Sequence, residues 1–221
     1  MSATPLRLVV LISGRGSNMT ALARACLAGE VNGRVVRVIA DRADAAGLAS
    51  ARDLGAETVT VVRTHGSPIE AFEAELRARI DEAQPDLIPL AGFMRILSAP
   101  FVARYLGRLL NIHPSLLPAF RGLHTHRRAL EAGAREHGAS VHFVTPELDA
   151  GPVVLQSRVT VRPTDTEATL AARVLATEHI IYPQVLAWFA QGRLAWHDGA
   201  AWLDGERLEQ PIVEDFRAAT P

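Results

Sequence analysis

Near its start the chain carries a continuous run that encodes a strand, a tight turn and a helix start: Leu6-Arg7-Leu8-Val9-Val10-Leu11-Ile12-Ser13-Gly14-Arg15-Gly16-Ser17-Asn18. Residues 6–12 are apolar except for Arg7, which is typical of a strand buried on both faces of a sheet. Residues 19–27 then place apolar side chains at helical spacing, and Asn18 is expected to cap that helix. The run therefore predicts the first strand, turn and helix of an α/β protein.

Strand-like and helix-like segments alternate along the rest of the chain. Further strands are predicted at 35–40, 57–62, 87–91, 108–112, 140–144 and 153–161, and shorter helices at 45–54, 98–107 and 125–132. Two capping boxes predict longer helices, at Ser67-Pro68-Ile69-Glu70 and Thr164-Asp165-Thr166-Glu167. Pro89 is expected to mark a strand end or bulge, and Pro183 to kink or split the last helix.

This alternation predicts one domain over residues 1–221, with a mostly parallel twisted sheet and helices on both faces. Asp-Gly pairs at 198–199 and 204–205 predict a hairpin near the C-terminus. Ligands of such sheets bind at the carboxyl ends of the strands, near a topological switch point. We therefore look for function in the segments that follow the strands.

The composition is that of an ordinary globular protein. The chain has 221 residues, of which 21% are charged, and a formal net charge of −1. No basic run indicates nucleic-acid or membrane binding. Cys26 is the single cysteine, and the N-terminus shows neither a signal peptide nor a membrane span. We expect a cytoplasmic protein, a monomer or homodimer, whose partners are small-molecule substrates.

The glycine turn at residues 13–18 is a candidate anion site. Glycines allow a sharp turn with outward-facing amides, and the following helix adds a partial positive charge. A dinucleotide fingerprint is an alternative, because Asp41 ends the second predicted strand where a ribose-binding acid would lie. However, Met19 replaces the third glycine of that fingerprint, whereas Ser17 and Asn18 offer polar side chains to a small anion.

Two polar residues end the strand predicted at 108–112. Strand alternation puts Asn111 and His113 on the same face, and Pro114 stops the strand. An amide and an imidazole together can polarise a carbonyl oxygen and move a proton. Asp149 lies in a loop between two predicted strands, and a carboxylate close to His113 would favour its protonated form.

Other polar residues give weaker signals. His124 and His126 alternate in a loop without a third ligand, so no metal ion is expected. His137 and His142 have no evident partner in the sequence. Ser115 lies near His113, but no nucleophile elbow surrounds it.

Four motifs occur in the order seen in the folate-dependent formyltransferases. They are Ser13-Gly14-Arg15-Gly16-Ser17-Asn18, Ala91-Gly92-Phe93-Met94-Arg95-Ile96-Leu97, Asn111-Ile112-His113-Pro114-Ser115-Leu116-Leu117-Pro118 and Leu148-Asp149-Ala150-Gly151-Pro152. The likeness reaches Trp202-Leu203-Asp204-Gly205 and so covers nearly the whole chain. The sequence thus resembles this family, and within it most resembles the members that formylate a glycinamide ribonucleotide in purine biosynthesis.

The resemblance implies a Rossmann-like formyltransferase fold, and an enzyme that uses 10-formyltetrahydrofolate as cosubstrate. It implies catalytic roles for Asn111, His113 and Asp149. It places the ribonucleotide on Gly16, Ser17, Asn18 and Glu178. It places the folate on Met94, Arg95, Ile96, Leu97, Asn111, Thr145, Pro146, Glu147, Leu148 and Asp149.

Several alternatives stay open. A formyltetrahydrofolate hydrolase would need an extra N-terminal domain, and a tRNA-formylating relative would need a C-terminal domain and a basic surface. A sugar-nucleotide formyltransferase is disfavoured by Gly16-Ser17-Asn18, which suits a terminal phosphate. Rivals from other classes are a dinucleotide-dependent oxidoreductase and a non-catalytic binding module.

Overall fold

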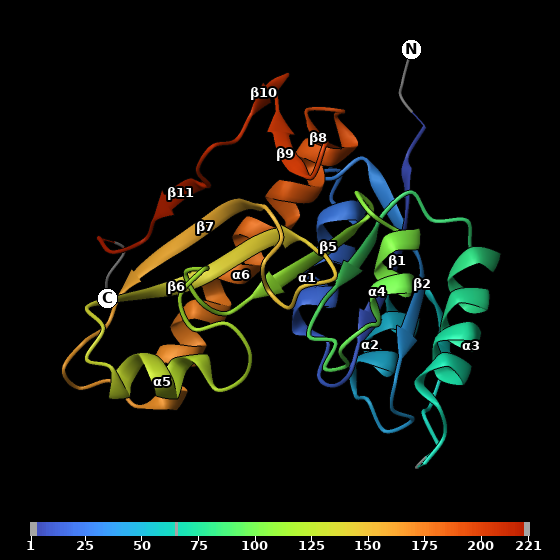
Figure 1. Cartoon of the computed structure of the whole chain (residues 1–221), viewed down its shortest axis with the longest axis horizontal. Helices are drawn as coiled ribbons and strands as arrows, with labels where there is room; N and C mark the ends of the chain where they lie inside the picture. The colour runs from blue at the N-terminus through green and yellow to red at the C-terminus, as the bar shows by residue number, and fades with distance from the viewer. Residues whose placement is uncertain (1–3, 65, 219–221) are drawn as a thin grey trace.

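An eight-stranded sheet with helices on both faces forms the body of the protein in a computed structural model, which describes residues 4–64 and 66–218 (Figure 1). The strand order is β11-β7-β6-β5-β4-β1-β2-β3. The strands are β1 (Leu6–Ile12), β2 (Gly33–Ala40), β3 (Glu57–Thr60), β4 (Ile88–Leu90), β5 (Leu109–His113), β6 (Glu136–Phe143), β7 (Val153–Thr160) and β11 (Ile212–Asp215). All neighbours are parallel except β5 with β6 and β6 with β7, so the predicted mostly parallel sheet is confirmed.

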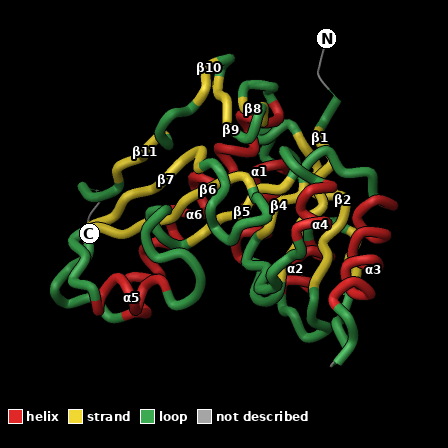
Figure 2. Tube along the Cα trace, in the orientation of Figure 1, coloured by secondary structure: helices red, strands yellow, loops and turns green. Residues whose placement is uncertain are grey.

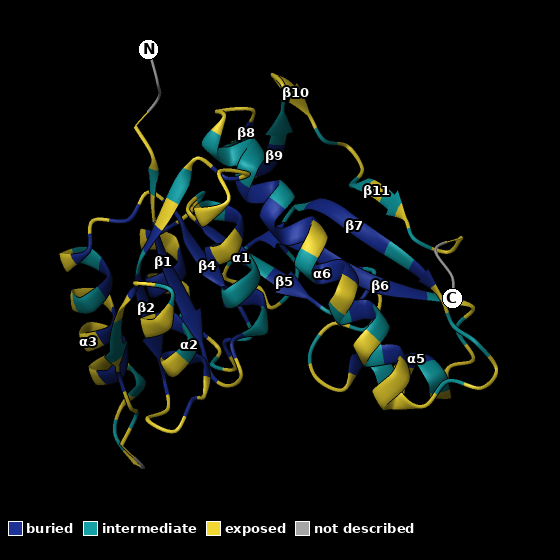
Figure 3. Cartoon of the chain, turned by 180° about the vertical axis from the view of Figure 1, so that it is seen from behind, coloured by how far each residue is buried: buried dark blue, intermediate teal, exposed yellow. Residues whose placement is uncertain are grey.

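The helices cover the sheet from two sides, alternating with the strands along the chain (Figure 2). They are α1 (Ser17–Leu27), α2 (Gly47–Asp53), α3 (Ile69–Glu82), α4 (Ala99–Arg104), α5 (Thr125–Glu131) and α6 (Glu167–Ala190). Alternate residues of β1 pack against α1, α2 and α6 on one face and against α3 and α4 on the other. Burial on both faces explains the unbroken apolar sequence of this strand. Figure 3 shows α6 lying across the sheet.

The chain reverses its winding direction at β1. From β1 it proceeds to β2 and β3 on one side, and then returns to β4 and β5 on the other. The carboxyl ends of β1 and β4 therefore face a topological switch point, where crevices form in open α/β sheets. The glycine turn follows β1 and the segment 92–97 follows β4, so two of the motifs meet there.

Three of the predicted helix starts are wrong in detail. Gly16, in the left-handed conformation with φ of 71°, is the N-cap of α1, and Asn18 lies inside that helix. At α3 the cap position is Pro68, while the Ser67 hydroxyl donates to the Thr64 carbonyl. At α6 a capping box is present but is formed by Thr166 and Thr169, two residues later than expected. Tertiary contacts and local turns compete for the same polar side chains, so capping patterns shift.

Pro89 and Pro183 lie inside regular secondary structure, although the sequence predicts that each interrupts its strand or helix. Pro89 does not end β4 or form a bulge there, and the strand pairs with β5 on both sides of it. The nitrogen of Pro89, which has no hydrogen to donate, faces β1. The hydrogen bonds between β1 and β4 are made by Leu87 and Ala91 instead. Pro183 does not split α6, which continues from Glu167 to Ala190. The fully buried Tyr182 and Val185 on either side of it anchor the helix in the core.

A small antiparallel sheet follows α6. It consists of β8 (Leu194–His197), β9 (Ala200–Leu203) and β10 (Glu206–Arg207), in the order β10-β9-β8. The Asp-Gly pairs form its two turns, so the predicted hairpin is confirmed and extended by a third strand. The final strand β11 returns to the large sheet beside β7. Within the described part of the chain, no helix has the length and apolar character needed to cross a membrane.

Candidate active site

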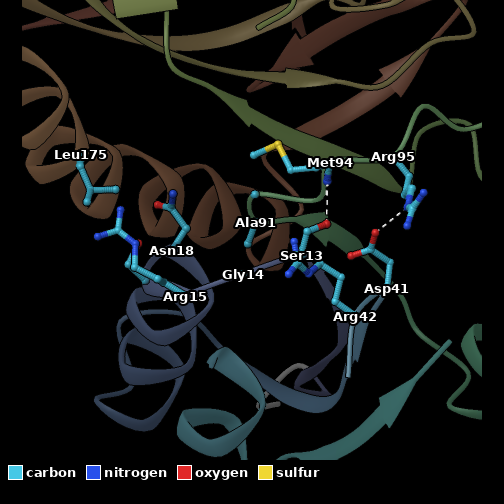
Figure 4. Close-up of a pocket in the computed structure, with 13 residues that line it drawn as sticks. Ser13, Gly14, Arg15, Asn18, Asp41, Arg42, Ala91, Met94, Arg95 and Leu175 are labelled. Atoms are coloured by element: carbon cyan, nitrogen blue, oxygen red, sulfur yellow. Dashed lines mark hydrogen bonds and ion pairs between the residues drawn. The ribbon is translucent and has the colours of Figure 1, made fainter. Parts of the chain in front are cut away.

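The glycine turn opens the first of two neighbouring recesses at the carboxyl ends of the strands. A left-handed backbone at Gly16 costs little only for glycine. A Cβ at this position would lie 2.9 Å from the Cα of Gly47, the first residue of α2. Close packing of these backbones leaves the N-terminus of α1 facing a cavity of about 440 Å³ (Figure 4). Helix N-termini of this kind bind phosphates through free amides.

The residues that were assigned to a ribonucleotide lie in or beside this cavity. Gly16, Ser17 and Asn18 line it, whereas Glu178 stands behind Asn18 on α6. The Asn18 amide nitrogen donates to the Glu178 carboxylate at 2.6 Å. Burial raises the pKa of Glu178, and the hydrogen bond from Asn18 opposes this shift. Asn18 is therefore a link between the turn and α6 rather than a helix cap.

Sequence reasoning missed the charged residues Arg15 and Arg42 of this cavity, and considered Asp41 only as the ribose-binding acid of the dinucleotide alternative. Arg15, Arg42 and Asp41 also line it. Arg15 stands between the two glycines of the turn, which is a local signal that could have been used. Arg42 forms an exposed ion pair with Asp44, and Asp41 holds Arg95. The excess of arginines gives the cavity a positive lining that suits a phosphate dianion.

We expect the substitution Gly16→Ala to raise the KM for a phosphorylated substrate about ten-fold, the loss of one charge-assisted hydrogen bond. The added methyl group would press on Gly47 and deform the turn. Initial-rate kinetics with each substrate varied would measure this. Gly29→Ala is the matched control, because Gly29 has a φ of 78° with nothing within 4 Å of an added Cβ. Equal effects of both substitutions would show that backbone strain alone is responsible.

The second recess lies between the segment after β4 and the loop after β6. Arg95, Ile96 and Leu97 line one wall of it. The other wall is the loop formed by Thr145, Pro146, Glu147, Leu148 and Asp149. A larger adjoining cavity of about 430 Å³ includes Met94 together with Asn111, His113 and Asp149. All residues that the family resemblance assigns to the folate thus line one or both of these cavities, which share Arg95, Ile96, Asn111, Leu148 and Asp149.

His113 ends β5 with acceptors next to both of its ring nitrogens. Its Nδ1 lies 3.5 Å from Oδ2 of Asp149, and its Nε2 lies 3.1 Å from the carbonyl oxygen of Phe120. His113 and Asp149 are both largely buried. Because a carbonyl and a carboxylate can only accept, the surroundings complement a ring that donates from both nitrogens.

Asn111 is oriented by a histidine on the neighbouring strand. Antiparallel pairing of β5 with β6 places His142 directly opposite Asn111. His142 donates from Nδ1 to the Phe143 carbonyl at 2.9 Å, so its Nε2 is free to accept from the Asn111 amide at 3.1 Å. Burial lowers the pKa of His142 to about 4, which keeps the ring neutral as this role requires. The second hydrogen of the Asn111 amide then remains for a substrate oxygen.

The two loops that carry the site are tied together by Asp149. Its backbone is left-handed, with φ of 49°, a conformation in which Asp and Asn are enriched. Its carboxylate accepts from the Gly122 amide at 2.9 Å, which joins it to the segment 114–124. Phe120 in that segment has φ of 54°, a strained conformation for an aromatic residue. The backbone conformation of Asp149 and its hydrogen bond from Gly122 together fix the carboxylate beside His113.

A pair of histidines lies beside the site, with His137 buried and His126 half-buried in the lining of the larger cavity. His137 Nε2 is 3.1 Å from His126 Nδ1, so each has a partner that the sequence did not reveal. Burial, with a smaller contribution from His126, lowers the pKa of His137 to about 4. Among the residues that the structure describes, no cluster of three or more potential metal ligands occurs.

Acidification is expected to destabilise the fold through His137 and His142. Their folded-state pKa values, about 4, lie below the ordinary value of 6.5, so the unfolded chain binds more protons between those pH values. The free energy of unfolding should therefore fall as the pH drops from 6.5 toward 4, by about 3 kcal/mol at most for each residue. Urea denaturation at pH 7 and pH 5 measures the slope. His137→Gln should flatten it, and an unchanged slope would contradict this assignment.

A recess that contains a carbonyl-polarising group and adjoins a turn suited to an anion is typical of a group-transfer enzyme of the α/β class. Comparison with known proteins identifies the family. Residues 6–186 match the formyl transferase family, and the chain belongs to it.

Relatives in this family resemble the chain over nearly its whole length. It is 55% identical to the phosphoribosylglycinamide formyltransferase of Escherichia coli over 203 residues, which cover 92% of this chain and 96% of that protein. It is 41% identical to the Haemophilus influenzae protein of the same name over 202 residues, or 91% and 95% of the two chains. The solved phosphoribosylglycinamide formyltransferase from Coxiella burnetii superposes with a TM-score of 0.89 at 47% identity, covering 94% of this chain and 99% of that one.

Proposed function

We propose that the chain transfers the formyl group of 10-formyltetrahydrofolate to the amine of 5-phosphoribosylglycinamide, as a step of de novo purine biosynthesis. The products are 5-phosphoribosyl-N-formylglycinamide and tetrahydrofolate. The observation that carries this proposal is the junction of two recesses. The glycine turn, which suits a phosphate, lines the first recess. Residues that suit the folate line the other, whose larger cavity also contains Asn111, His113 and Asp149.

The proposed reaction is a direct transfer. The substrate amine attacks the formyl carbon, and the carbonyl electrons move to the oxygen. Asn111 donates to that oxygen through the amide hydrogen that His142 leaves free. Protonated His113 donates the second hydrogen bond, and Asp149 stabilises the charge of the ring. When the tetrahedral intermediate collapses, the bond from carbon to N10 of the folate breaks, and N10 receives the proton that the attacking amine loses.

The substrate has to displace one acceptor from His113. Asp149 is held by its own loop and by Gly122, whereas the Phe120 carbonyl lies in a strained turn. A formyl oxygen in place of the Phe120 carbonyl would restore the hydrogen bond to Nε2. We therefore assign the Nε2 side of the ring to the oxyanion, and the Nδ1 side to Asp149.

An assay of formyl transfer tests the proposal. Purified protein would be mixed with 10-formyltetrahydrofolate and 5-phosphoribosylglycinamide, and both products would be quantified. A reaction without the ribonucleotide measures hydrolysis by water. Tetrahydrofolate release that does not depend on the ribonucleotide would favour a hydrolase. Tight binding of NAD without folate binding, measured by calorimetry, would favour the oxidoreductase alternative.

A further inference from the structure

Asp41 forms an ion pair with Arg95 in the lining of the cavity beside the glycine turn (Figure 4). Asp41 directly follows β2, and Arg95 lies in the segment after β4. The Arg95 Nε donates to Asp41 Oδ2 at 2.6 Å. The Asp41 side chain is 3% exposed, whereas that of Arg95 is 37% exposed. A buried acid therefore anchors an arginine whose outer part reaches the cavities.

Arg95 lies where the recesses meet. It lines the cavity beside the glycine turn, the narrow recess beside Asn111, and the larger cavity that contains His113. Only its Nε is used by Asp41. Neither terminal nitrogen of its guanidinium makes a hydrogen bond to another residue in the described ranges, so both are available to ligands.

The backbone around this pair is held firmly. The Asp41 amide donates to the Ile12 carbonyl at 3.3 Å, which fixes the acid beside β1. The Ser13 amide donates to the Gly92 carbonyl at 3.1 Å, and the Met94 amide donates to the Ser13 hydroxyl at 2.8 Å. The segment that carries Arg95 is thus attached to the end of β1, and the ion pair completes the attachment at the level of the side chain.

We infer that Asp41 is a positioning residue, which holds the Arg95 guanidinium in the wall of the folate recess and so sets the affinity for the folate. This inference rests on the proposed function, because it concerns the binding of its cosubstrate. Without the carboxylate, Arg95 would keep its charge but lose its anchor, and folate binding would have to restrict a long, mobile side chain. The reacting groups at Asn111 and His113 would not be changed.

Three substitutions separate positioning from electrostatics. Asp41→Asn preserves the shape of the side chain but removes the charge that holds Arg95. We expect it to raise the KM for 10-formyltetrahydrofolate about ten-fold, the loss of a charge-assisted hydrogen bond, while kcat and the KM for the ribonucleotide stay within about two-fold. Asp44→Asn is the matched control, since Asp44 pairs with Arg42 at the rim of the same cavity and is exposed. It removes an equal charge without contacting Arg95 and should leave the folate KM unchanged.

A double-mutant cycle with Arg95→Met tests whether Asp41 acts through Arg95. Asp41→Asn should raise the folate KM in the wild-type background and have no further effect in the Arg95→Met background. Additive effects would overturn the inference, as would an Asp44→Asn phenotype equal to that of Asp41→Asn, or a parallel rise in both KM values.

Tetrahydrofolate titrations by calorimetry provide a readout that needs no turnover. If the wild-type protein neither binds tetrahydrofolate nor transfers formyl groups, the proposed function fails. If it does both and Asp41→Asn changes neither, the role of Asp41 alone fails.

Discussion

Replacement of His113 by asparagine is expected to lower kcat by about 10²- to 10⁴-fold, the range that a positioned acid–base group contributes. The imidazole stands between Asp149 and the Phe120 carbonyl, where only a doubly donating ring satisfies both neighbours. Asparagine can donate one hydrogen bond to the oxyanion but cannot carry a positive charge. The charge that develops on the formyl oxygen would therefore lose its electrostatic partner.

Single-turnover kinetics with saturating substrates would measure this loss directly. His197→Asn is a suitable control, because His197 ends β8 and does not line the site cavities of the described chain. Circular dichroism and thermal unfolding would establish that both variants fold. Turnover of His113→Asn close to that of the wild-type protein would exclude this residue as the charged hydrogen-bond donor to the oxyanion.

The substitution Asp149→Asn should lower kcat by up to about 10⁴-fold, the loss that the same substitution causes in a catalytic Asp–His pair. The side-chain oxygen of the asparagine can still accept the hydrogen bond from the Gly122 amide, and asparagine tolerates the left-handed backbone. What is lost is the negative charge 3.5 Å from His113 Nδ1. Without that charge, the ring loses the carboxylate that supports it while it donates to the oxyanion, and the oxyanion is stabilised less.

Asp198→Asn provides a control with the same chemical change in the same backbone conformation. Asp198 has φ of 49°, equal to that of Asp149, but it lies in the turn between β8 and β9. Steady-state kinetics should show a fall in kcat only for Asp149→Asn. If kcat were unchanged and only the folate KM rose, Asp149 would be a binding residue rather than a catalytic one.

Local sequence signals predicted much of the fold and part of the candidate site. The apolar run of β1 and the glycine turn indicated a strand, a turn and a helix, and strand alternation put Asn111 and His113 on one face. These features depend on neighbours a few residues away. The proximity of Asp149 to His113 was expected from the chemistry of the pair, and the structure gives a separation of 3.5 Å.

The missed features depend on contacts between distant segments. His142 orients Asn111 only because β5 and β6 pair in one antiparallel register, which no local pattern specifies. Asp41 and Arg95 are 54 residues apart. Asn18 resembled a helix cap, but its side chain bonds to Glu178, which is 160 residues away. Where a polar residue has both a local and a distant partner available, its sequence context alone does not decide between them.

The left-handed backbone of Asp149 also restricts how this position can evolve. Glycine, asparagine and aspartate adopt this conformation readily, whereas most other residues incur about 1–2 kcal/mol. Only aspartate among these three carries a charge. A glutamate would preserve the charge but not the local preference, so Asp149→Glu meets a conformational barrier before its chemistry is tested. When all twenty residues are tested at this position, we therefore expect few variants to keep the stability of the wild-type protein. Only aspartate is expected to give full activity as well.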